Sequence, residues 1–139
     1  MSNNTLSPYI FPGVDVETLD PSVFPFVNNY RNTKSMDRIF RVVQARFNVN
    51  RSEILSPSRK QELVYARSVL SFLFRRWLGM SYKKIGFAIG KRNHATAIHN
   101  EKTFIDMYRT SREFRENVME IIDSLDINIE KLLVNKMSK

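Results

Sequence analysis

The chain has 139 residues, 42% of them hydrophobic, which is enough for one modest globular domain and hardly for two. It has no cysteine, which excludes disulfides and thiolate metal sites, and no apolar run near the roughly 20 residues that span a bilayer. The 22 Lys and Arg against 14 Asp and Glu give a net charge of +8, which favours a polyanionic partner.

The charge is unevenly placed along the chain. Residues 1–30 hold three acids and no base, residues 31–115 nineteen bases and six acids, and residues 116–139 three bases and five acids. Such a cationic body is typical of proteins that bind nucleic acid or an acidic membrane surface, although a basic protein without such a partner has the same composition. The N-terminus "MSNNTLSPYI" lacks the charged start and apolar core of a signal peptide, so the cytoplasm is the expected location.

Residues 1–34 are predicted to form an extended N-terminal arm. The first thirty residues hold all but one of the five prolines, interleaved with Tyr9, Phe11, Phe24 and Phe26. Proline at this density blocks a regular helix, while the aromatic residues are too many for a solvated linker. The arm is therefore expected to lie on a surface, either that of its own domain or that of a protein partner.

A helical domain is predicted over residues 35–125. From Ser35, apolar residues recur at helical spacing in "SMDRIFRVVQARFNV", and "NRSEILSPS" then breaks the period and supplies Ser58 as a candidate N-cap. The longer segment "RKQELVYARSVLSFLFRRWLG" has the same spacing and ends at Gly79. These two helices are expected to form most of the core, and no segment indicates a strand.

Two further helices joined by a glycine turn are predicted in "SYKKIGFAIGKRNHATAIHNEKTF". Ser81 can cap the first, Gly90 suits the positive φ that ends a helix, and Asn93 can cap the second. Two helices joined by about four residues around a glycine outline a helix-turn-helix. Ser111 is expected to open a last amphipathic helix, and residues 126–139 to extend that helix or to fray.

The stretch "GKRNHATAIHN" holds both histidines, but an enzyme or metal site is disfavoured there. His94 and His99 are five residues apart, an offset of about 140° on a helix, so they do not share a face as a metal-binding pair does. No serine lies in a nucleophile-elbow context, and four glycines do not supply a phosphate-cradling loop. We expect no catalytic residue, cofactor or metal. For His99, a core-edge histidine bonded to a neighbouring carbonyl is preferred, and a role in binding is left open as the alternative.

The start of the second short helix suits DNA instead. Its unpaired N–H groups and positive dipole end, preceded by Lys91 and Arg92, favour a phosphate. The side chains of residues 93–96 are Asn, His, Ala and Thr, which bind or pack on base edges in a major groove. Lys83 and Lys84 lie where helix-turn-helix proteins commonly touch backbone phosphate, although a charge run on a helix is usually a solvated face.

The segment "SRKQELVYARSVLSFLFRRWLGMSYKKIGFAIGKRNHATAIHNEKTF" resembles the C-terminal DNA-binding domain of DnaA, the bacterial chromosomal replication initiator. The resemblance is carried by "SRK" with the "AR" that follows it, by "SYKKIG", like the family's Ser-Leu-x-x-Ile-Gly, and by "GKRNHAT", like its Gly-Gly-Arg-Asp-His-Thr-Thr. His99 follows at the family's spacing. The resemblance covers about residues 35–125 and implies an all-α domain that contains a helix-turn-helix.

The resemblance also implies how DNA is bound. The family places its recognition helix in the major groove of a short asymmetric duplex, and its base-reading positions are occupied here by Asn93, His94, Ala95 and Thr96. Phosphate contacts would come from Arg92, Lys91, Lys83 and Lys84. Arg67 matches an arginine that enters the adjacent minor groove, which changes its interpretation from a solvated to a functional residue.

Two residues depart from the family's signature, whose aspartate is Asn93 here and whose first threonine is Ala95. An amide both accepts and donates where a carboxylate only accepts, so the preferred site is expected to differ at one or two base pairs, each worth roughly 1–3 kcal/mol. The initiator's ATPase module needs a P-loop and about two hundred more residues, so no ATP hydrolysis is expected of these 139 residues.

The leading hypothesis is a cytoplasmic, nucleoid-associated protein that binds double-stranded DNA sequence-specifically, in replication or transcription control of a bacterium, phage or plasmid. The alternative is an interaction or structural protein that uses the fold as a scaffold, with residues 1–34 docked on a larger assembly. The basic residues around the turn favour the first, and the departures at Asn93 and Ala95 favour the second. The DNA site, the oligomeric state and the host process stay open.

Overall fold

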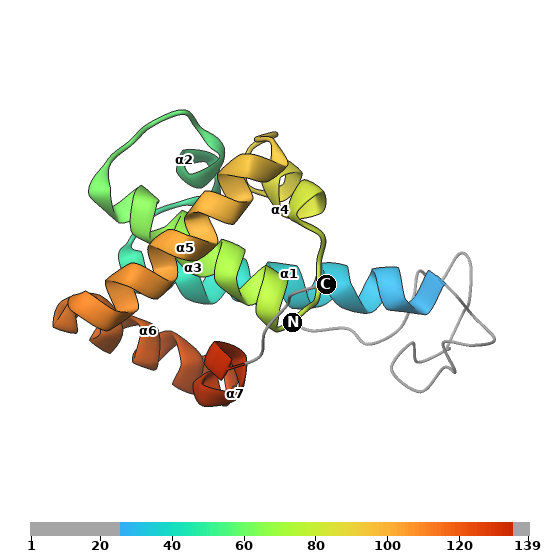
Figure 1. Ribbon diagram of the computed structural model, residues 1–139. Coiled ribbons are helices and arrows are strands. Elements are labelled where there is room, and N and C mark those ends of the chain that lie inside the picture. The colour runs from blue at the N-terminus through green and yellow to red at the C-terminus, as the bar shows by residue number, and fades with distance from the viewer. Residues whose placement is uncertain (1–25, 135–139) are drawn as a thin grey trace. The chain divides into compact units, whose positions relative to one another are not determined.

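A computed structural model of the chain describes residues 26–134, with residues 26–33 as backbone alone, and these residues are all-α, with no strand among them (Figure 1). The chain divides between Met36 and Asp37 into two units. Helix α1 (Phe26–Phe47) crosses this division, and its residues from Asp37 belong to the second unit. The later helices are α2 (Arg51–Leu55), α3 (Gln61–Arg76), α4 (Tyr82–Ala88), α5 (His94–Thr110), α6 (Arg112–Leu125) and α7 (Ile129–Val134).

Helix α1 begins earlier than predicted. Since it starts at Phe26, the prediction of an extended arm up to residue 34 is wrong for the end of that arm, which is helical. The dense prolines stop at Pro25 and the next is Pro57, so no proline blocks a helix in between. The remainder of the predicted arm, residues 1–25, lies outside the described residues.

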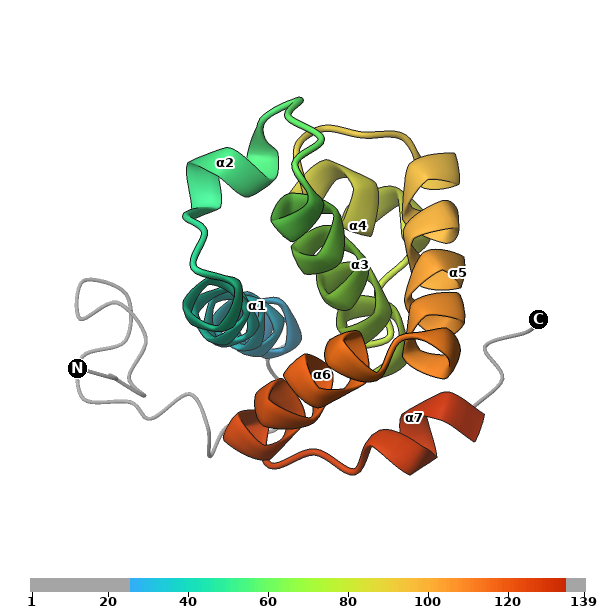
Figure 2. The same cartoon turned by 90° about the vertical axis from the view of Figure 1, so that its left-hand side faces the viewer.

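Helix α3 forms the centre of the second unit. It packs against α2, α4 and α5, and α5 packs in turn against α4 and α6 (Figure 2). A column of buried aromatic rings joins three of these helices: Phe72 of α3 stacks on Phe104 of α5 at 3.9 Å between ring centroids, and Phe104 meets Phe114 of α6 edge-on at 5.5 Å. This column fixes α5 at its middle and leaves its first turns at the surface.

Helix α2 was not predicted. It interrupts the segment interpreted as a break, and Asn50 caps it: the Asn50 side-chain oxygen accepts from the backbone N–H of Glu53 at 2.8 Å, and the Glu53 carboxylate accepts from the backbone N–H of Asn50 at 3.0 Å. This reciprocal pair is a capping box, whose spacing is visible in the sequence. Ser58 is not an N-cap, because α3 begins at Gln61 after Lys60.

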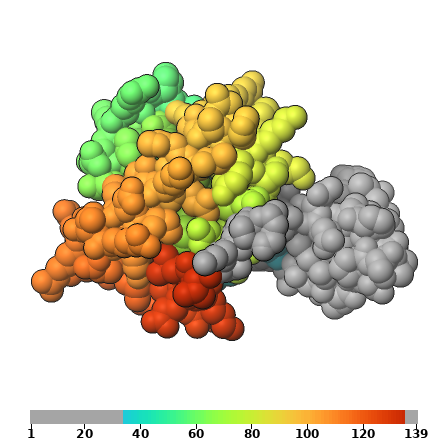
Figure 3. Space-filling model, in the orientation of Figure 1, coloured from blue at the N-terminus to red at the C-terminus, as the bar shows by residue number. Residues whose placement is uncertain are grey.

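The C-terminal part of the described chain neither extends α6 nor frays. Asp126 ends α6 with a left-handed φ of 57°, and α7 follows as a separate helix whose Ile129 and Leu132 are buried. By contrast, the prediction that Ser111 opens α6 is confirmed, because its hydroxyl accepts from the backbone N–H of Phe114 at 3.1 Å. In the space-filling view α5 crosses the visible face, with α4 at one end and α6 and α7 at the other (Figure 3).

Candidate nucleic-acid interface

Helices α4 and α5 form the predicted helix-turn-helix, and both predicted caps are confirmed. The Ser81 hydroxyl accepts from the backbone N–H of Lys84 at 3.2 Å, and the Asn93 side-chain oxygen accepts from that of Thr96 at 3.0 Å. Gly90 has the expected positive φ, at 122°. Lys91 also has a positive φ, 59°, which the sequence did not indicate because a lysine rarely adopts it.

Gly86 sets the distance between the two helices. A Cβ added there would lie 2.7 Å from the backbone oxygen of Asn93 and would overlap that of Arg92. The backbone N–H of Arg92 donates to the Gly86 carbonyl at 2.8 Å across the same contact. Only glycine allows this approach, so the "IG" of "SYKKIG" is explained by close packing rather than by an unusual φ.

Arg67 lies beneath the segment that joins α2 to α3. Its side chain is buried, and its guanidinium donates to four backbone carbonyls: from Nε to Ile54 at 2.8 Å, from Nη1 to Ser58 at 2.6 Å, and from Nη2 to Ser56 at 2.7 Å and Glu53 at 3.2 Å. Hydrogen bonds from a charged donor are stronger than neutral ones. The conformation of the α2–α3 segment is therefore held from below by one side chain.

Arg92 reaches the same segment from the helix-turn-helix. Its guanidinium donates to the Ser56 carbonyl at 2.6 Å and to the carbonyl of Ile89. Burial lowers the pKa of both arginines below the ordinary value, and the charge of Arg92 lowers that of Arg67 further. Neither guanidinium has a carboxylate partner within the described part of the chain, so the two positive charges are balanced by carbonyl dipoles alone. Because the two charges are close together, their surroundings favour an anion.

The placement of Arg67 differs from the expectation for a minor-groove residue. Only 6% of the Arg67 surface is exposed, and its side chain points into the protein. In this conformation the guanidinium is not available to DNA, so a contact between Arg67 and DNA stays a prediction. The exposed residues of the α2–α3 segment are Pro57, Arg59 and Lys60, and its two cations were not among the predicted site residues.

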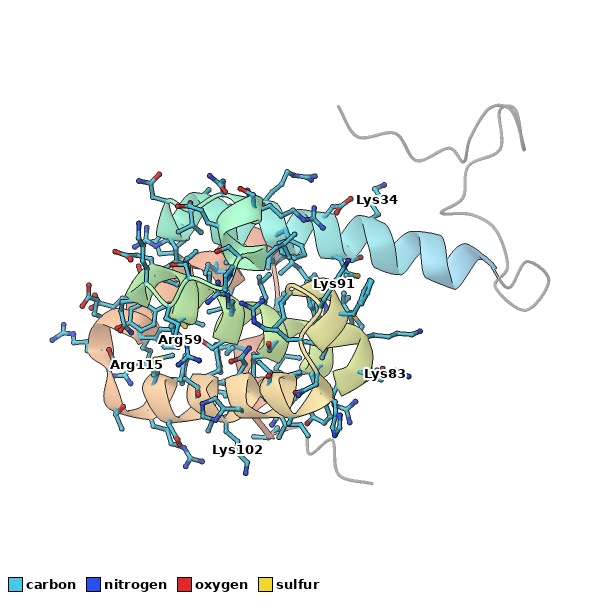
Figure 4. All side chains as sticks on the ribbon, turned by 90° about the horizontal axis from the view of Figure 1, so that it is seen from above. Lys34, Arg59, Lys83, Lys91, Lys102 and Arg115 are labelled. Carbon is cyan, nitrogen blue, oxygen red and sulfur yellow. The ribbon has the colours of Figure 1, made fainter. Side chains whose placement is uncertain are left out.

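An open groove of about 630 Å³ lies between the α2–α3 segment and the first turns of α5. Its walls bring together residues from three separate stretches of sequence: Pro57, Arg59, Val64, Arg67, Arg92, Asn93, Ala95, Thr96, His99 and Asn100. His94 is exposed at the start of α5 but does not line the groove, and Lys83, Lys84 and Lys91 are exposed outside it. Figure 4 shows Arg59, Lys83 and Lys91 at separate places around α5.

Two groove residues of α5, His99 and Asn100, were not among the predicted site residues. His99 is exposed, with Nε2 3.5 Å from the Thr103 hydroxyl, so its interpretation as a core-edge histidine bonded to a carbonyl is wrong. The side-chain nitrogen of Asn100 is buried and has no hydrogen-bond partner among the described residues. The signal that could have found them is their spacing from Thr96, since residues three and four apart share a helix face.

Glu101 anchors α5 on the side away from the groove. Its buried carboxylate accepts from Arg76 Nε at 2.6 Å and from the Tyr82 hydroxyl at 2.5 Å, and Arg76 also donates to the Leu132 carbonyl at 2.7 Å. Burial, and then the hydrogen bond to Glu101, raise the pKa of Tyr82. This network joins α5 to α3, α4 and α7, so it fixes the angle at which the start of α5 is presented.

Other classes of site find no support in the described residues. No group of three or more His, Asp or Glu there could hold a metal ion. None of the helices in that part of the chain is long and apolar enough to cross a membrane.

Two capped helices around a tight turn, with cations about the start of the second, define a helix-turn-helix domain of the kind that binds DNA. Residues 36–103 match the family described as bacterial DnaA protein helix-turn-helix, and this segment of the chain belongs to that family. The resemblance found in the sequence is thereby confirmed.

Relatives of the chain carry the name chromosomal replication initiator protein DnaA. That of Bacteroides thetaiotaomicron is 32% identical over 108 residues, which are 78% of this chain and 23% of the relative. That of Flavobacterium psychrophilum is 32% identical and that of a Synechococcus species 28% identical, each over 114 residues, 82% of this chain and 24% of the relative. The chain thus spans about a quarter of the length of these relatives. No solved structure matches it.

Proposed function

We propose that the chain binds double-stranded DNA sequence-specifically, with the start of α5 in a major groove. The observation that carries the proposal is that Asn93, His94 and Ala95 form an exposed edge at the start of α5. The Asn93 side-chain oxygen accepts from Thr96 at the helix cap, so its amide N–H groups are what it offers to a base edge. His can donate to a purine, and Ala can meet a thymine methyl group. Thr96 completes this edge from the wall of the groove.

The phosphate contacts are proposed to come from exposed cations on both sides of α5. Lys83, Lys84 and Lys91 would contact one strand, and Arg59 and Lys60 a second stretch of backbone across the groove. Each neutralised phosphate releases counterions, so log affinity should fall with log salt by about 0.9 per contact.

Arg67 and Arg92 are proposed to position these two groups of contacts. Both donate to the Ser56 carbonyl, at 2.7 and 2.6 Å, so the α2–α3 segment and the helix-turn-helix are tied at one atom. A fixed separation between two contact regions favours one register on the duplex, because phosphate contacts set orientation.

The process is proposed to be DNA replication, or transcription control through the same sites. The relatives are named as replication initiators, but the chain matches only about a quarter of their length, and the matched family segment is the helix-turn-helix. We therefore propose binding to duplex DNA in the bacterial cytoplasm, on the chromosome or on phage or plasmid DNA. We do not propose that these residues hydrolyse ATP.

Selection of bound duplexes from a random pool, at two salt concentrations, tests this function. The wild-type chain should enrich one motif, and His94→Ala should enrich it at least tenfold less, while Thr110→Ala at the far end of α5 serves as the matched control. A pool without enrichment would refute specific binding and favour a protein that uses the fold as a scaffold. An enriched motif that His94→Ala binds as tightly as wild type would refute the proposed docking.

A further inference from the structure

Phe87 is the most exposed aromatic side chain in the described part of the chain, at 67%. It lies on α4, where its neighbours Ile85 and Gly86 are buried. An exposed phenyl ring contributes nothing to the core and is unfavourable in water. A single exposed apolar residue is nevertheless common on protein surfaces, so the surroundings of the ring decide whether it has a role.

The surroundings of Phe87 are cationic. Lys83 and Lys84 precede it by four and three residues and share its face of the helix, and both are exposed. Lys91, also exposed, donates its backbone N–H to the Phe87 carbonyl at 3.0 Å. Residues 63–100, which include these positions, hold seven Lys and Arg and no Asp or Glu. We call Lys83, Lys84, Phe87 and Lys91 the α4 outer face.

The α4 outer face suits a partner that carries both negative charge and flat apolar surfaces. In Figure 3 α4 lies at the surface beside the start of α5, against which it packs. The lysines of this face are already proposed as phosphate contacts along one DNA strand, so the ring between them faces the same strand. Phosphate and sugar give a phenyl ring little to bind, whereas the face of a nucleobase stacks on it.

A continuous duplex does not offer such a base. Each of its bases is paired and stacked, and drawing one out costs at least as much free energy as stacking on one aromatic side chain returns. A base that is already unpaired has no such cost. The ring at the centre of the α4 outer face therefore favours DNA in which a base beside the site has left the stack.

We propose that Phe87 stacks on an unpaired base of the strand that the lysines of the α4 outer face contact. The chain then binds its duplex site more tightly beside a bulged base than in continuous duplex, by about tenfold, which is the effect expected of one stacking contact. The placement of the lysines on that strand rests on the proposed function. The stacking itself requires no particular base, because every base has an aromatic face.

The test uses the full chain and a selected duplex with one extra base in one strand, placed in turn at each position along and beside the site. The extra base is 2-aminopurine, whose fluorescence falls when an aromatic ring stacks on it. Phe87→Leu keeps an apolar side chain without the aromatic ring, and Phe87→Trp keeps an aromatic ring. Met119→Ser, which removes an exposed apolar side chain from α6, is the matched control.

Wild type, Phe87→Trp and Met119→Ser should bind about tenfold more tightly, and quench the fluorescence, when the extra base is at one or two positions at the edge of the site. Phe87→Leu should bind bulged and continuous duplexes equally and without quenching. Equal affinity of wild type for all these duplexes, or a preference that Phe87→Leu retains, would overturn the proposal. Weaker binding of a correctly folded Phe87→Leu to continuous duplex would also overturn it, because the ring would then contact intact DNA.

This proposal and the proposed function fail in different ways. If selection enriches no duplex, the proposed function fails, and stacking is tested at low salt on an unselected duplex with an extra 2-aminopurine, which phosphate contacts alone can hold. Wild type should quench its fluorescence and Phe87→Leu should not, and absence of quenching by wild type would overturn the proposal. An enriched motif whose bulged forms bind no more tightly would overturn the stacking, leave the proposed function intact and favour a protein partner for Phe87.

Discussion

Arg67→Lys tests whether Arg67 acts inside the protein or on DNA. The guanidinium donates to four carbonyls between Glu53 and Ser58, at 2.6 to 3.2 Å, with 6% of the residue exposed. Lysine keeps the charge but has three donors on one atom, so it cannot reach carbonyls that lie around a planar fork. At least one or two charge-assisted bonds are lost, each worth about 1.5–3 kcal/mol.

The free energy of unfolding should therefore fall by about 2–4 kcal/mol, after allowance for water that replaces some of the lost bonds. The measurement is urea denaturation of the DNA-free protein followed by circular dichroism, in which the midpoint should fall by about 1–2 M. Arg59→Lys, at an exposed position in the same segment, should leave the midpoint unchanged. An unaltered midpoint for Arg67→Lys, combined with loss of DNA binding, would refute the internal role and support a direct contact with the duplex.

Three further predictions concern the helix-turn-helix. Gly86→Ala should cost about 1–3 kcal/mol and abolish specific binding in a gel-shift assay, because its Cβ would overlap the backbone oxygens of Arg92 and Asn93 just before α5. Gly79→Ala is the control: its Cβ would meet open space, and although the positive φ of 69° costs some stability, duplex binding by the folded protein should stay intact. Burial and the hydrogen bond to Glu101 raise the pKa of Tyr82 in the folded protein. The stability that Tyr82 contributes is therefore full below its unfolded pKa of about 10 and is lost as pH rises through the folded pKa. The free energy of unfolding, measured from about pH 8 to 11, should fall more steeply for wild type than for Tyr82→Phe. Asn93→Asp should keep the helix cap and the melting temperature yet change the selected base at one position by roughly 1–3 kcal/mol, and an unchanged motif would contradict a base contact by residue 93.

The local features of the helix-turn-helix could be predicted from the sequence because each depends on neighbouring residues. Ser81, Asn93 and Ser111 cap their helices through bonds to the residue three positions on, and Gly90 supplies the positive φ of the turn within the same few residues. The family resemblance includes the same stretch, within a match over residues 36–103. The capping box of α2 was equally local, and its spacing would have revealed the helix.

The tertiary structure decided which side chains share the groove. The sequence predicted that Arg67 contacts DNA, whereas the structure buries it under carbonyls that lie 9 to 14 residues away in the chain. No local pattern indicates that the α2–α3 segment folds back over α3. His99 lines the groove for the same reason, because the opposite wall is formed by Pro57 and Arg59, which are distant from it in the sequence. The sequence by itself thus determined the class of protein and the caps and turn that shape the start of α5, through short-range bonds and helical period. Only the folded chain decided which arginines stay inside, because that depends on the meeting of segments distant in the sequence.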